Sequence, residues 1–584
     1  MEPKLVVVAL LYAFSRLCYS QGLPTVDLGY EIHRAISLDA TGQFYNFSNI
    51  RFAQPPVGDL RWAAPEPPTG RNLVVQNGSI GRICPQANPT WLTLGFANLP
   101  NVVAGNASDF NVSLAEQQLQ AAPPGAVPFD SFRNGKLPPQ DPRTTEDCLF
   151  LDVVVPKSIF DKVNNGTLKP GQQRGAPVMA WIYGGGYTIG EKSSGNDVHG
   201  MMKTASQMDG LVFVAMNYRL GALGFLSGPT LQAAGGVSNA GLLDQRLALE
   251  WIQKYIHLFG GDPDRVTITG ESAGGGSIEF QITAYGGLKP APFQRAMPQS
   301  PGFIPSTSTF LQENTTQTFL KMINASSIAE ARKVSSDVLI KANAMQIATS
   351  NWGTFTYGPV VDGTFAPALP GLLLNAGSSA PNISVFNSHC GNEGALFTPP
   401  YLKTEEDVDA WFQISYPEAV DEVREYVLTT LYPPVYDDAT NETHPYTSLL
   451  ERVYLMISES AFLCNIDYTN RAYGQSTSNG SSKSYTYAFE IGPSFHGCDA
   501  GYNFYTGQPT NATTGMFASY AQQLQDYQVR FITTGDPNGP GLPVWPAERA
   551  GNASAKLLTP KGWSTVPDPT RNHRCEWWQK GLAS

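Results

Sequence analysis

The sequence has few positively charged residues, and they form no cluster. Its 584 residues include 38 Lys and Arg against 49 Asp and Glu, a formal net charge of −11 at pH 7. Because Lys and Arg must neutralise the phosphates of a bound nucleic acid, we do not expect nucleic acid as a partner. Hydrophobic residues make up 42% of the chain and charged residues 15%. This composition is too apolar for a disordered chain and ample for a large core.

Long hydrophobic runs are absent after the N-terminal segment. No later stretch has the length and apolarity of a membrane helix, and residues 577–584 lack the tail of a lipid-anchor signal, so no stable membrane insertion is expected. The one early run, Leu5–Phe14, follows Lys4 and precedes Cys18 and Ser20 at suitable −3 and −1 positions. This pattern predicts a signal peptide over residues 1–20 and a mature chain that begins near Gln21.

Cysteines are scarce, and no two of them have CxxC spacing, so a zinc site is not expected. Six of the seven remain once Cys18 leaves with the signal peptide, an even number that suits an oxidising compartment. Asn-x-Ser/Thr sequons are numerous by contrast, and together with the signal peptide they predict a secreted glycoprotein. The possible glycosylation sites are Asn46, Asn77, Asn106, Asn111, Asn165, Asn314, Asn324, Asn382, Asn441, Asn479, Asn511 and Asn552.

Internal repeats and Gly/Ser linkers are also absent, so residues 21–584 are predicted to form a single domain. Continuous apolar runs at 177–183, 211–216 and 266–269 are typical of strands buried on both faces. Between the last two, residues 242–252 place apolar side chains at helical spacing. This order predicts an α/β fold with a large, mostly parallel central sheet, helices on both faces and long loop insertions.

Residues 85–147 break this pattern. The stretch is rich in Pro, Gly and Asn, and we interpret it as a lid-like insertion, because structureless loops of this length are usually lids or disordered segments. Its apolar residues are Trp91, Leu92, Leu94, Phe96, Leu99, Val102 and Val103. A second segment, 405–427, is acidic and has the pattern of a solvated amphipathic helix, to which we assign no chemical role.

The strongest chemical signal is Gly270-Glu271-Ser272-Ala273-Gly274, directly after the apolar run 266–269. A Gly-x-Ser-x-Gly pattern between a strand and a helix is typical of the nucleophile elbow of α/β hydrolases. Glycines flank the serine because the turn is strained and a Cβ at either place would clash with the neighbouring chain. The pattern predicts Ser272 as the nucleophile.

A serine nucleophile needs a base, and the sequence has only seven histidines. Three of them precede Ser272, against the Ser–acid–His order of this fold: His33, His199 and His257. Three others are poorly placed, before any suitable acid, in a polar sequon-bearing loop or at the far C-terminus: His389, His444 and His573. His496 opens a loop after the strand-like run 485–490 and is the predicted base.

The supporting acid should lie between Ser272 and His496, on a loop that follows a strand. Glu393 follows the run 383–386 and is our prediction, with Asp362 and Asp499 as alternatives. A carboxylate in this position would orient the imidazole and stabilise the imidazolium. Upstream, the glycines at 184–186 follow a strand-like run, and their backbone amides, with the amide of Ala273, are predicted to form an oxyanion hole.

Together these features resemble the type-B carboxylesterase/lipase family, which includes cholinesterases, and are closest in pattern to secreted fungal carboxylesterases. The likeness covers nearly the whole mature chain and rests on segments in the family's order: Arg51–Gly58, Glu146–Leu151, Asn217–Gly221, Phe259–Pro263, Gly270–Gly275 and Thr534–Asn538. It implies an α/β-hydrolase fold, a Ser272–Glu393–His496 triad, and the amides of Gly185, Gly186 and Ala273 as oxyanion donors.

The resemblance also implies two disulfides, Cys84–Cys148 and Cys464–Cys575. Because the acid and base loops must meet in space, we hypothesise a third bridge between Cys390 and Cys498. The sequence departs from the family in having Tyr183 before the glycines, where the lipase-type pattern has His. The interval between Cys84 and Cys148 is much longer than in cholinesterases, without the tryptophan-bearing loop that holds a quaternary ammonium. A choline-specific enzyme is therefore not expected.

The sequence thus predicts a secreted serine carboxylic-ester hydrolase that needs no cofactor or metal and acts on small, aromatic or natural-product esters. A triacylglycerol or sterol-ester lipase with a mobile lid is the alternative within the same chemistry, and an acyl transferase on the same fold stays open. A non-catalytic, cholinesterase-like adhesion protein is disfavoured, because it would need a broken triad. No oligomeric state is predicted.

Overall fold

A mixed sheet of eleven strands forms the centre of the molecule, in the order β14-β13-β12-β11-β10-β9-β7-β8-β6-β4-β3. The strands from β13 to β8 run parallel, whereas β14 at one end and β6, β4 and β3 at the other pair antiparallel. Their bounds are β3 Ser37–Asp39, β4 Phe44–Arg51, β6 Phe150–Pro156, β7 Ala176–Ile182, β8 Val212–Met216, β9 Gly261–Glu271, β10 Arg295–Gln299, β11 Ser384–Cys390, β12 Ser484–Phe489, β13 Ser554–Thr559 and β14 Gly562–Pro567.

The computed structural model describes residues 22–583, apart from 42, 124, 165–174, 196, 305, 438–442, 475–481, 508–515 and 549–552. The predicted signal peptide lies outside these residues, as do the sequons at Asn165, Asn441, Asn479, Asn511 and Asn552. A separate small sheet near the N-terminus consists of β1 Thr25–Asp27, β2 Glu31–Arg34 and β5 Asn72–Gln76.

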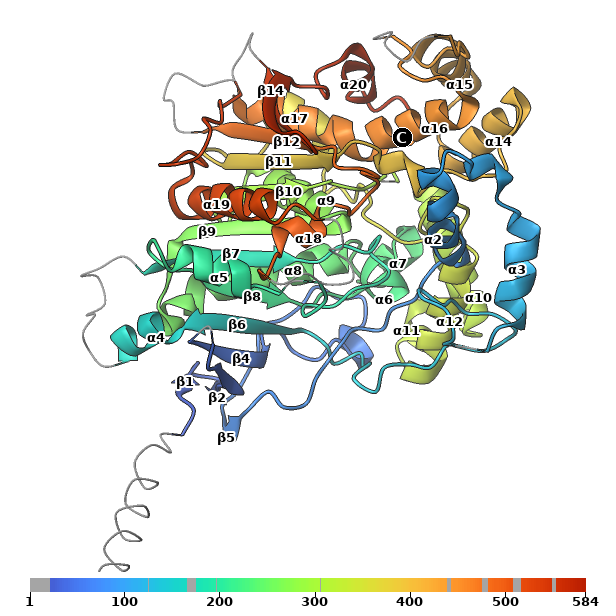
Figure 1. Ribbon diagram of the computed structural model, residues 1–584. Coiled ribbons are helices and arrows are strands. Elements are labelled where there is room, and N and C mark those ends of the chain that lie inside the picture. The colour runs from blue at the N-terminus through green and yellow to red at the C-terminus, as the bar shows by residue number, and fades with distance from the viewer. Residues whose placement is uncertain are drawn as a thin grey trace, which may run out of the picture.

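The three apolar runs of the sequence are strands β7, β8 and β9 of this sheet, and every residue of β7 and β8 is buried. Strands buried on both faces require helices on both sides. On one side lie α8 (Ala240–Tyr255), α9 (Ala273–Thr283) and α17 (Cys464–Gly474), and on the other α5 (His199–Ala205) and α19 (Ala518–Thr534) (Figure 1). The predicted α/β architecture is therefore confirmed.

A layer of helices lies beyond the strand ends that are drawn at the right of Figure 1, and it encloses a second hydrophobic core. Side chains of this second core come from α2 Thr90–Val103, α3 Val112–Ala121, α14 Glu405–Ser415, α15 Asp421–Tyr426 and α16 Leu449–Ser458. Two further helices on this side, α10 Thr309–Met322 and α12 Ser336–Ala348, pack on the first core instead. The shorter helices are α4 Lys157–Asn164, α6 Gly221–Phe225, α7 Pro229–Ala233, α11 Ile328–Ala331, α13 Pro370–Asn375, α18 Ala500–Asn503 and α20 His573–Trp578.

The insertion at 85–147 contains two helices, α2 and α3, where the sequence suggested a structureless loop. The Pro and Gly content was misleading because α2 includes both Gly95 and Pro100. The helix is stabilised by tertiary packing, with Trp91, Leu92 and Leu94 buried in the second core. Segment 405–427 is helical as predicted, but Trp411 and Phe412 are buried rather than solvated.

The two disulfides implied by the resemblance, Cys84–Cys148 and Cys464–Cys575, are present. The hypothesised third bridge is not formed, because Cys390 and Cys498 are both free thiols. Cys390 ends the buried strand β11, and its thiol donates to the Asp499 carboxylate, with Sγ 3.8 Å from Oδ1. The acid and base loops do meet, but through backbone pairing of Asn392 with Phe495 instead of a covalent bond.

Six of the described sequons are exposed: Asn77, Asn106, Asn111, Asn314, Asn324 and Asn382. Asn46 is half-buried in β4, between two neighbouring strands. Within the described part of the chain, no helix combines the length and the apolarity needed to span a bilayer.

Candidate active site

Ser272 occupies the turn between β9 and α9 with φ +58° and ψ −125°, a left-handed conformation that a serine rarely adopts. The neighbouring glycines permit it. A Cβ on Gly270 would lie 2.6 Å from the Ile182 carbonyl oxygen, and one on Gly274 would lie 2.1 Å from the same atom. The local sequence thus produces a strained turn that exposes the serine hydroxyl beyond the end of β9.

The side chains of Ser272, His496 and Glu393 form one hydrogen-bonded chain. His496 Nε2 lies 2.8 Å from Ser272 Oγ, and His496 Nδ1 lies 2.5 Å from Glu393 Oε2. The three residues come from loops after β9, β12 and β11, which are near neighbours in the sheet. The structure therefore brings together all three side chains singled out in the sequence. In this arrangement the hydroxyl can pass its proton to the imidazole while the carboxylate orients the ring.

Glu393 is completely buried and accepts three hydrogen bonds. Besides His496, its donors are the Ser300 hydroxyl at 2.6 Å and the Cys390 backbone amide at 2.6 Å. Burial alone raises the pKa of this carboxyl, but the charge of His496 and these hydrogen bonds outweigh it and lower the pKa. Glu393 is thus held as a carboxylate beside the imidazole.

Burial lowers the pKa of His496, but the charges of Glu393 and Glu271 outweigh burial and raise it to about 9. Glu271, the residue before the serine, approaches the imidazole from the other side, with Oε1 3.4 Å from Nε2. Burial, with the charges of Asp499 and Glu393, raises the pKa of Glu271 to about 7 against the lowering effect of His496. We missed Glu271 in the sequence, although its place beside the nucleophile was a usable signal.

The two alternative acids do not touch the imidazole. Asp499 is buried behind the base loop, where its carboxylate accepts from the Tyr487 hydroxyl at 2.9 Å, and burial raises its pKa. Asp362 stabilises a turn by accepting from the amides of Thr364 and Ala366. Glu393 is therefore the carboxylate in position to support His496.

The predicted oxyanion glycines lie beside the serine. Gly185 and Gly186 have φ angles of +105° and +59°, and their backbone amides donate to no other group in the described residues. A Cβ on Gly186 would lie 2.3 Å from the Phe355 ring, and one on Gly185 would lie 2.3 Å from the Ile189 carbonyl oxygen. Only glycine fits such close approaches at positive φ. These amides, with that of Ala273, line the same cavity as Ser272 and are the candidate donors for an oxyanion.

A cavity of about 510 Å³ opens at the serine. Ser272, His496, the two glycines and Ala273 lie in its wall. The rest of the lining is mainly apolar and includes Leu92, Phe96, Tyr187, Phe303, Trp352, Phe355, Phe397, Trp411, Tyr416 and Phe462. Its charged groups, among the described residues, are Glu271, Glu418 and His496. Part of the aromatic wall comes from segments 352–355 and 405–427, which the sequence did not link to the site.

A parallel sheet with a serine at a strained strand–helix turn and a histidine on a later loop is the α/β-hydrolase architecture. The crystal structure of Aspergillus niger EstA has this fold, with a TM-score of 0.73 and 23% identity over 96% of this chain and 99% of that chain. The carboxylesterase family model matches residues 34–578. The chain belongs to the carboxylesterase family, and it is a carboxylic ester hydrolase.

Curated relatives span nearly the whole chain. Carboxylesterase patB of Penicillium expansum is 36% identical over 564 residues, and carboxylesterase patB of Aspergillus clavatus is 38% identical over 565 residues; each match covers 96% of both chains. A secreted lipase of Arthroderma benhamiae is 29% identical over 478 residues, which cover 77% of this chain and 86% of the lipase.

Proposed function

We propose that this chain is a secreted serine carboxylesterase that hydrolyses small, aromatic or natural-product esters through an acyl-enzyme on Ser272. The observation that carries the proposal is the hydrogen-bonded chain from Ser272 Oγ through His496 to Glu393, with contacts of 2.8 and 2.5 Å at the mouth of an apolar cavity. A serine is a weak nucleophile without such a base.

In the proposed mechanism, Ser272 Oγ attacks the ester carbonyl carbon while His496 Nε2 takes the hydroxyl proton. The carbonyl oxygen becomes an oxyanion that accepts hydrogen bonds from the amides of Gly185, Gly186 and Ala273. The imidazolium then gives its proton to the leaving alkoxide, so that an alcohol departs and an acyl-enzyme remains. Water, deprotonated by His496, repeats the attack and releases the carboxylic acid. Glu393 stays ionised throughout.

The cavity supports a neutral, compact substrate. A volume of about 510 Å³ lies within the usual range for small-molecule sites. Its described lining contains carboxylates and an imidazole but no Lys or Arg, so nothing there would neutralise a second carboxylate on the ester. Two relatives that cover 96% of the chain are named carboxylesterases, which also favours an esterase.

The lipase alternative requires a lid that opens, and the packing of α2 speaks against it. The Trp91 indole donates to the Thr354 carbonyl at 2.7 Å, and its rings contact Phe355 and Phe397. Both aromatic partners of Trp91 line the cavity, and so do Leu92 and Phe96 of α2 itself. The helix α2 is therefore part of the wall of the site. Moving it would expose large buried side chains at about 1.5–3 kcal/mol each.

Secretion is supported by the N-terminal pattern, which lies outside the described residues, and by two disulfides, which persist in oxidising compartments. A relative named a secreted lipase is consistent with this.

The decisive experiment is Ser272→Ala. We expect the variant to fold, to lose ester hydrolysis by several orders of magnitude and to lose covalent labelling by a fluorophosphonate, because it lacks the hydroxyl. Ser277→Ala is the matched control: Ser277 lies on α9 and bonds with Gln245, and its loss should leave labelling intact. A folded Ser272→Ala variant with near-wild-type turnover would disprove the proposed function.

A further inference from the structure

A single π-helical turn interrupts the long helix that runs from α16 to α17. It spans Glu459–Leu463, directly between Ser458 and Cys464. Such turns inside α-helices often occur at functional sites. Two of its residues, Ala461 and Phe462, line the cavity.

The interrupted helix contacts the loops of all three candidate catalytic residues. Toward the acid, Ser458 Oγ accepts from the amide of Gly394, the residue after Glu393, at 2.8 Å. This approach is close, since a Cβ on Gly394 would lie 2.1 Å from the Tyr454 carbonyl oxygen. Toward the base, the Phe462 ring lies 4.6 Å from the His496 ring between centroids.

Toward the nucleophile, the contact runs through the segment after β10. The amide of Gly302 donates to the carbonyl of Ser272 at 2.9 Å, and a Cβ on Gly302 would lie 2.5 Å from the Phe462 ring. Asn465 Nδ2 donates to the Pro301 carbonyl at 3.0 Å. Phe462 is thus packed between the base and the segment that supports the elbow.

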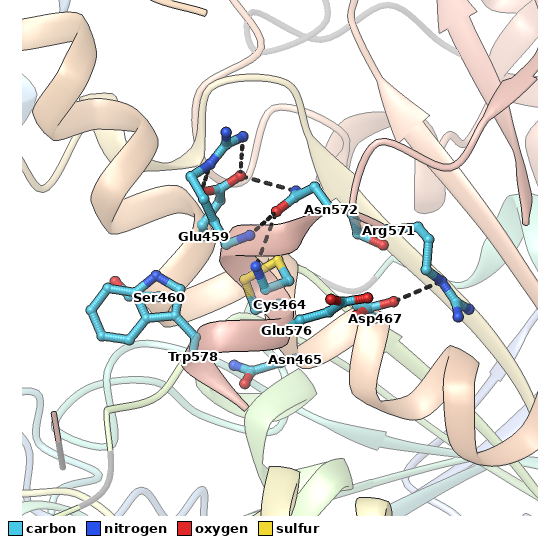
Figure 2. Close-up of a disulfide and its surroundings, with 12 residues drawn as sticks. Glu459, Ser460, Cys464, Asn465, Asp467, Arg571, Asn572, Glu576 and Trp578 are labelled. Carbon is cyan, nitrogen blue, oxygen red and sulfur yellow. Dashed lines mark hydrogen bonds and ion pairs between the residues drawn. A yellow bond between two sulfur atoms is a disulfide. The ribbon is translucent and has the colours of Figure 1, made fainter. Parts of the chain in front are cut away.

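The C-terminal clamp, residues Asn572–Cys575, holds both ends of the π turn (Figure 2). At the first end, the buried Glu459 carboxylate accepts from the Arg574 guanidinium at 2.7 and 2.8 Å and from Asn572 Nδ2 at 3.1 Å. At the other end, Cys464 forms its disulfide with Cys575. An ion pair and a covalent bond therefore bracket a five-residue turn.

We propose that Phe462 is a positioning residue for His496, and that the C-terminal clamp sets the π turn that carries it. The inference rests on the proposed function, because it takes His496 as the base. Glu393 holds only the Nδ1 edge of the imidazole, which can pivot about that bond. The rings of Phe462 and Phe397, at 4.6 and 5.2 Å, limit the pivot and keep Nε2 on Ser272 Oγ. Displacements of this kind of about 1 Å can cost about a hundredfold in rate.

The first test is Phe462→Leu, which keeps an apolar side chain but removes the ring. Turnover is expressed per active site, counted by fluorophosphonate titration, so misfolded protein does not contribute. We expect kcat per site to fall by about tenfold or more. We also expect the limb on which kcat/KM rises with pH to move to lower pH. An imidazole that pivots about its bond to Glu393 moves Nε2 away from the Glu271 carboxylate, which lies 3.4 Å from it and raises its pKa. The pKa of His496 then falls, and the active neutral form appears at lower pH.

The matched control is Phe303→Leu. Phe303 lines the same cavity but packs on Phe280, with ring centroids 5.0 Å apart, and its loss should change KM without moving the pH limb. A merely structural role of Phe462 would lower the thermal midpoint or the number of titratable sites and leave the limb where it is.

The second test removes the covalent half of the clamp with Cys464→Ser and Cys575→Ser together. The same downward movement of the limb is expected. The control is Glu576→Gln, a change on α20, the helix that carries Cys575. It breaks the ion pair of Glu576 with Arg471 of α17 without touching the π turn. If the double variant does not fold, Asn572→Ala tests the clamp in its place, because it removes the hydrogen bond to Glu459 and keeps the disulfide. The same downward movement is expected, and an unchanged pH profile in this variant would overturn the role of the clamp.

A Phe462→Leu variant with wild-type kcat per site and an unchanged pH profile of kcat/KM would overturn the positioning role, whatever its stability. A folded double cysteine variant whose pH profile of kcat/KM is unchanged would overturn the role of the clamp. Failure of the proposed function is distinguishable, because then the wild-type protein itself would not be labelled at Ser272.

Discussion

The imidazole of His496 lies among three carboxylates, those of Glu393, Glu271 and Asp499. Glu393 bonds to Nδ1, Glu271 lies 3.4 Å from Nε2, and Asp499 is buried behind the same loop. The carboxylates raise the pKa of His496 against the effect of burial, to about 9. Because a general base acts in its neutral form, kcat/KM for a neutral ester should increase with pH from neutrality towards pH 9.

At this scale we predict the effect of Glu271→Gln. Because the pKa of Glu271 is about 7, this carboxyl is largely ionised above pH 7. Its negative charge then stabilises the imidazolium of His496. Removing the charge lowers the pKa of His496, so the rising limb of kcat/KM should move to lower pH. The measurement is a pH–rate profile, with Glu418→Gln as the control for a cavity carboxylate that bonds to Ser306 instead. A limb that stays in place or moves upward would contradict this electrostatic account.

Among the elements, α2 supports the proposal of an esterase over a lipase. Its buried face packs on residues that line the cavity, and the Cys84–Cys148 bridge closes the segment that contains it. We therefore expect a rigid rim. The rates of hydrolysis of p-nitrophenyl esters of increasing chain length should follow simple saturation through each solubility limit. A sharp rise in rate when an emulsion forms would establish a mobile lid and the lipase alternative.

For the whole molecule, the covalent framework gives a simple test. Two disulfides and two free thiols are present among the described residues. In protein recovered from the culture medium and denatured without reductant, two thiols per chain should therefore react with a thiol reagent. Its N-terminal sequence should begin near Gln21 if the signal peptide is cleaved as predicted. If no thiol reacts, Cys390 and Cys498 do pair in the mature protein.

Local patterns were sufficient to single out the three side chains that the structure brings together. The glycines around Ser272 reflect a strained turn that is specified within five residues. The order of serine, acid and histidine along the chain then left few choices for Glu393 and His496. The buried apolar runs likewise identified β7, β8 and β9, because a strand covered on both faces is apolar at nearly every position.

Other features depend on residues far apart in the chain, and only the tertiary structure decided them. The helix α2 contains Pro and Gly and becomes stable through packing against 352–355 and 396–397, which a local pattern does not reveal. The free thiol of Cys390 follows from the orientation of a buried side chain toward Asp499. The clamp joins Asn572 to Glu459 across 113 residues, through contacts that neither segment signals alone. The sequence by itself thus determined the fold class and singled out the candidate catalytic side chains, whereas side-chain packing between distant segments shaped the cavity and the supports of the proposed base.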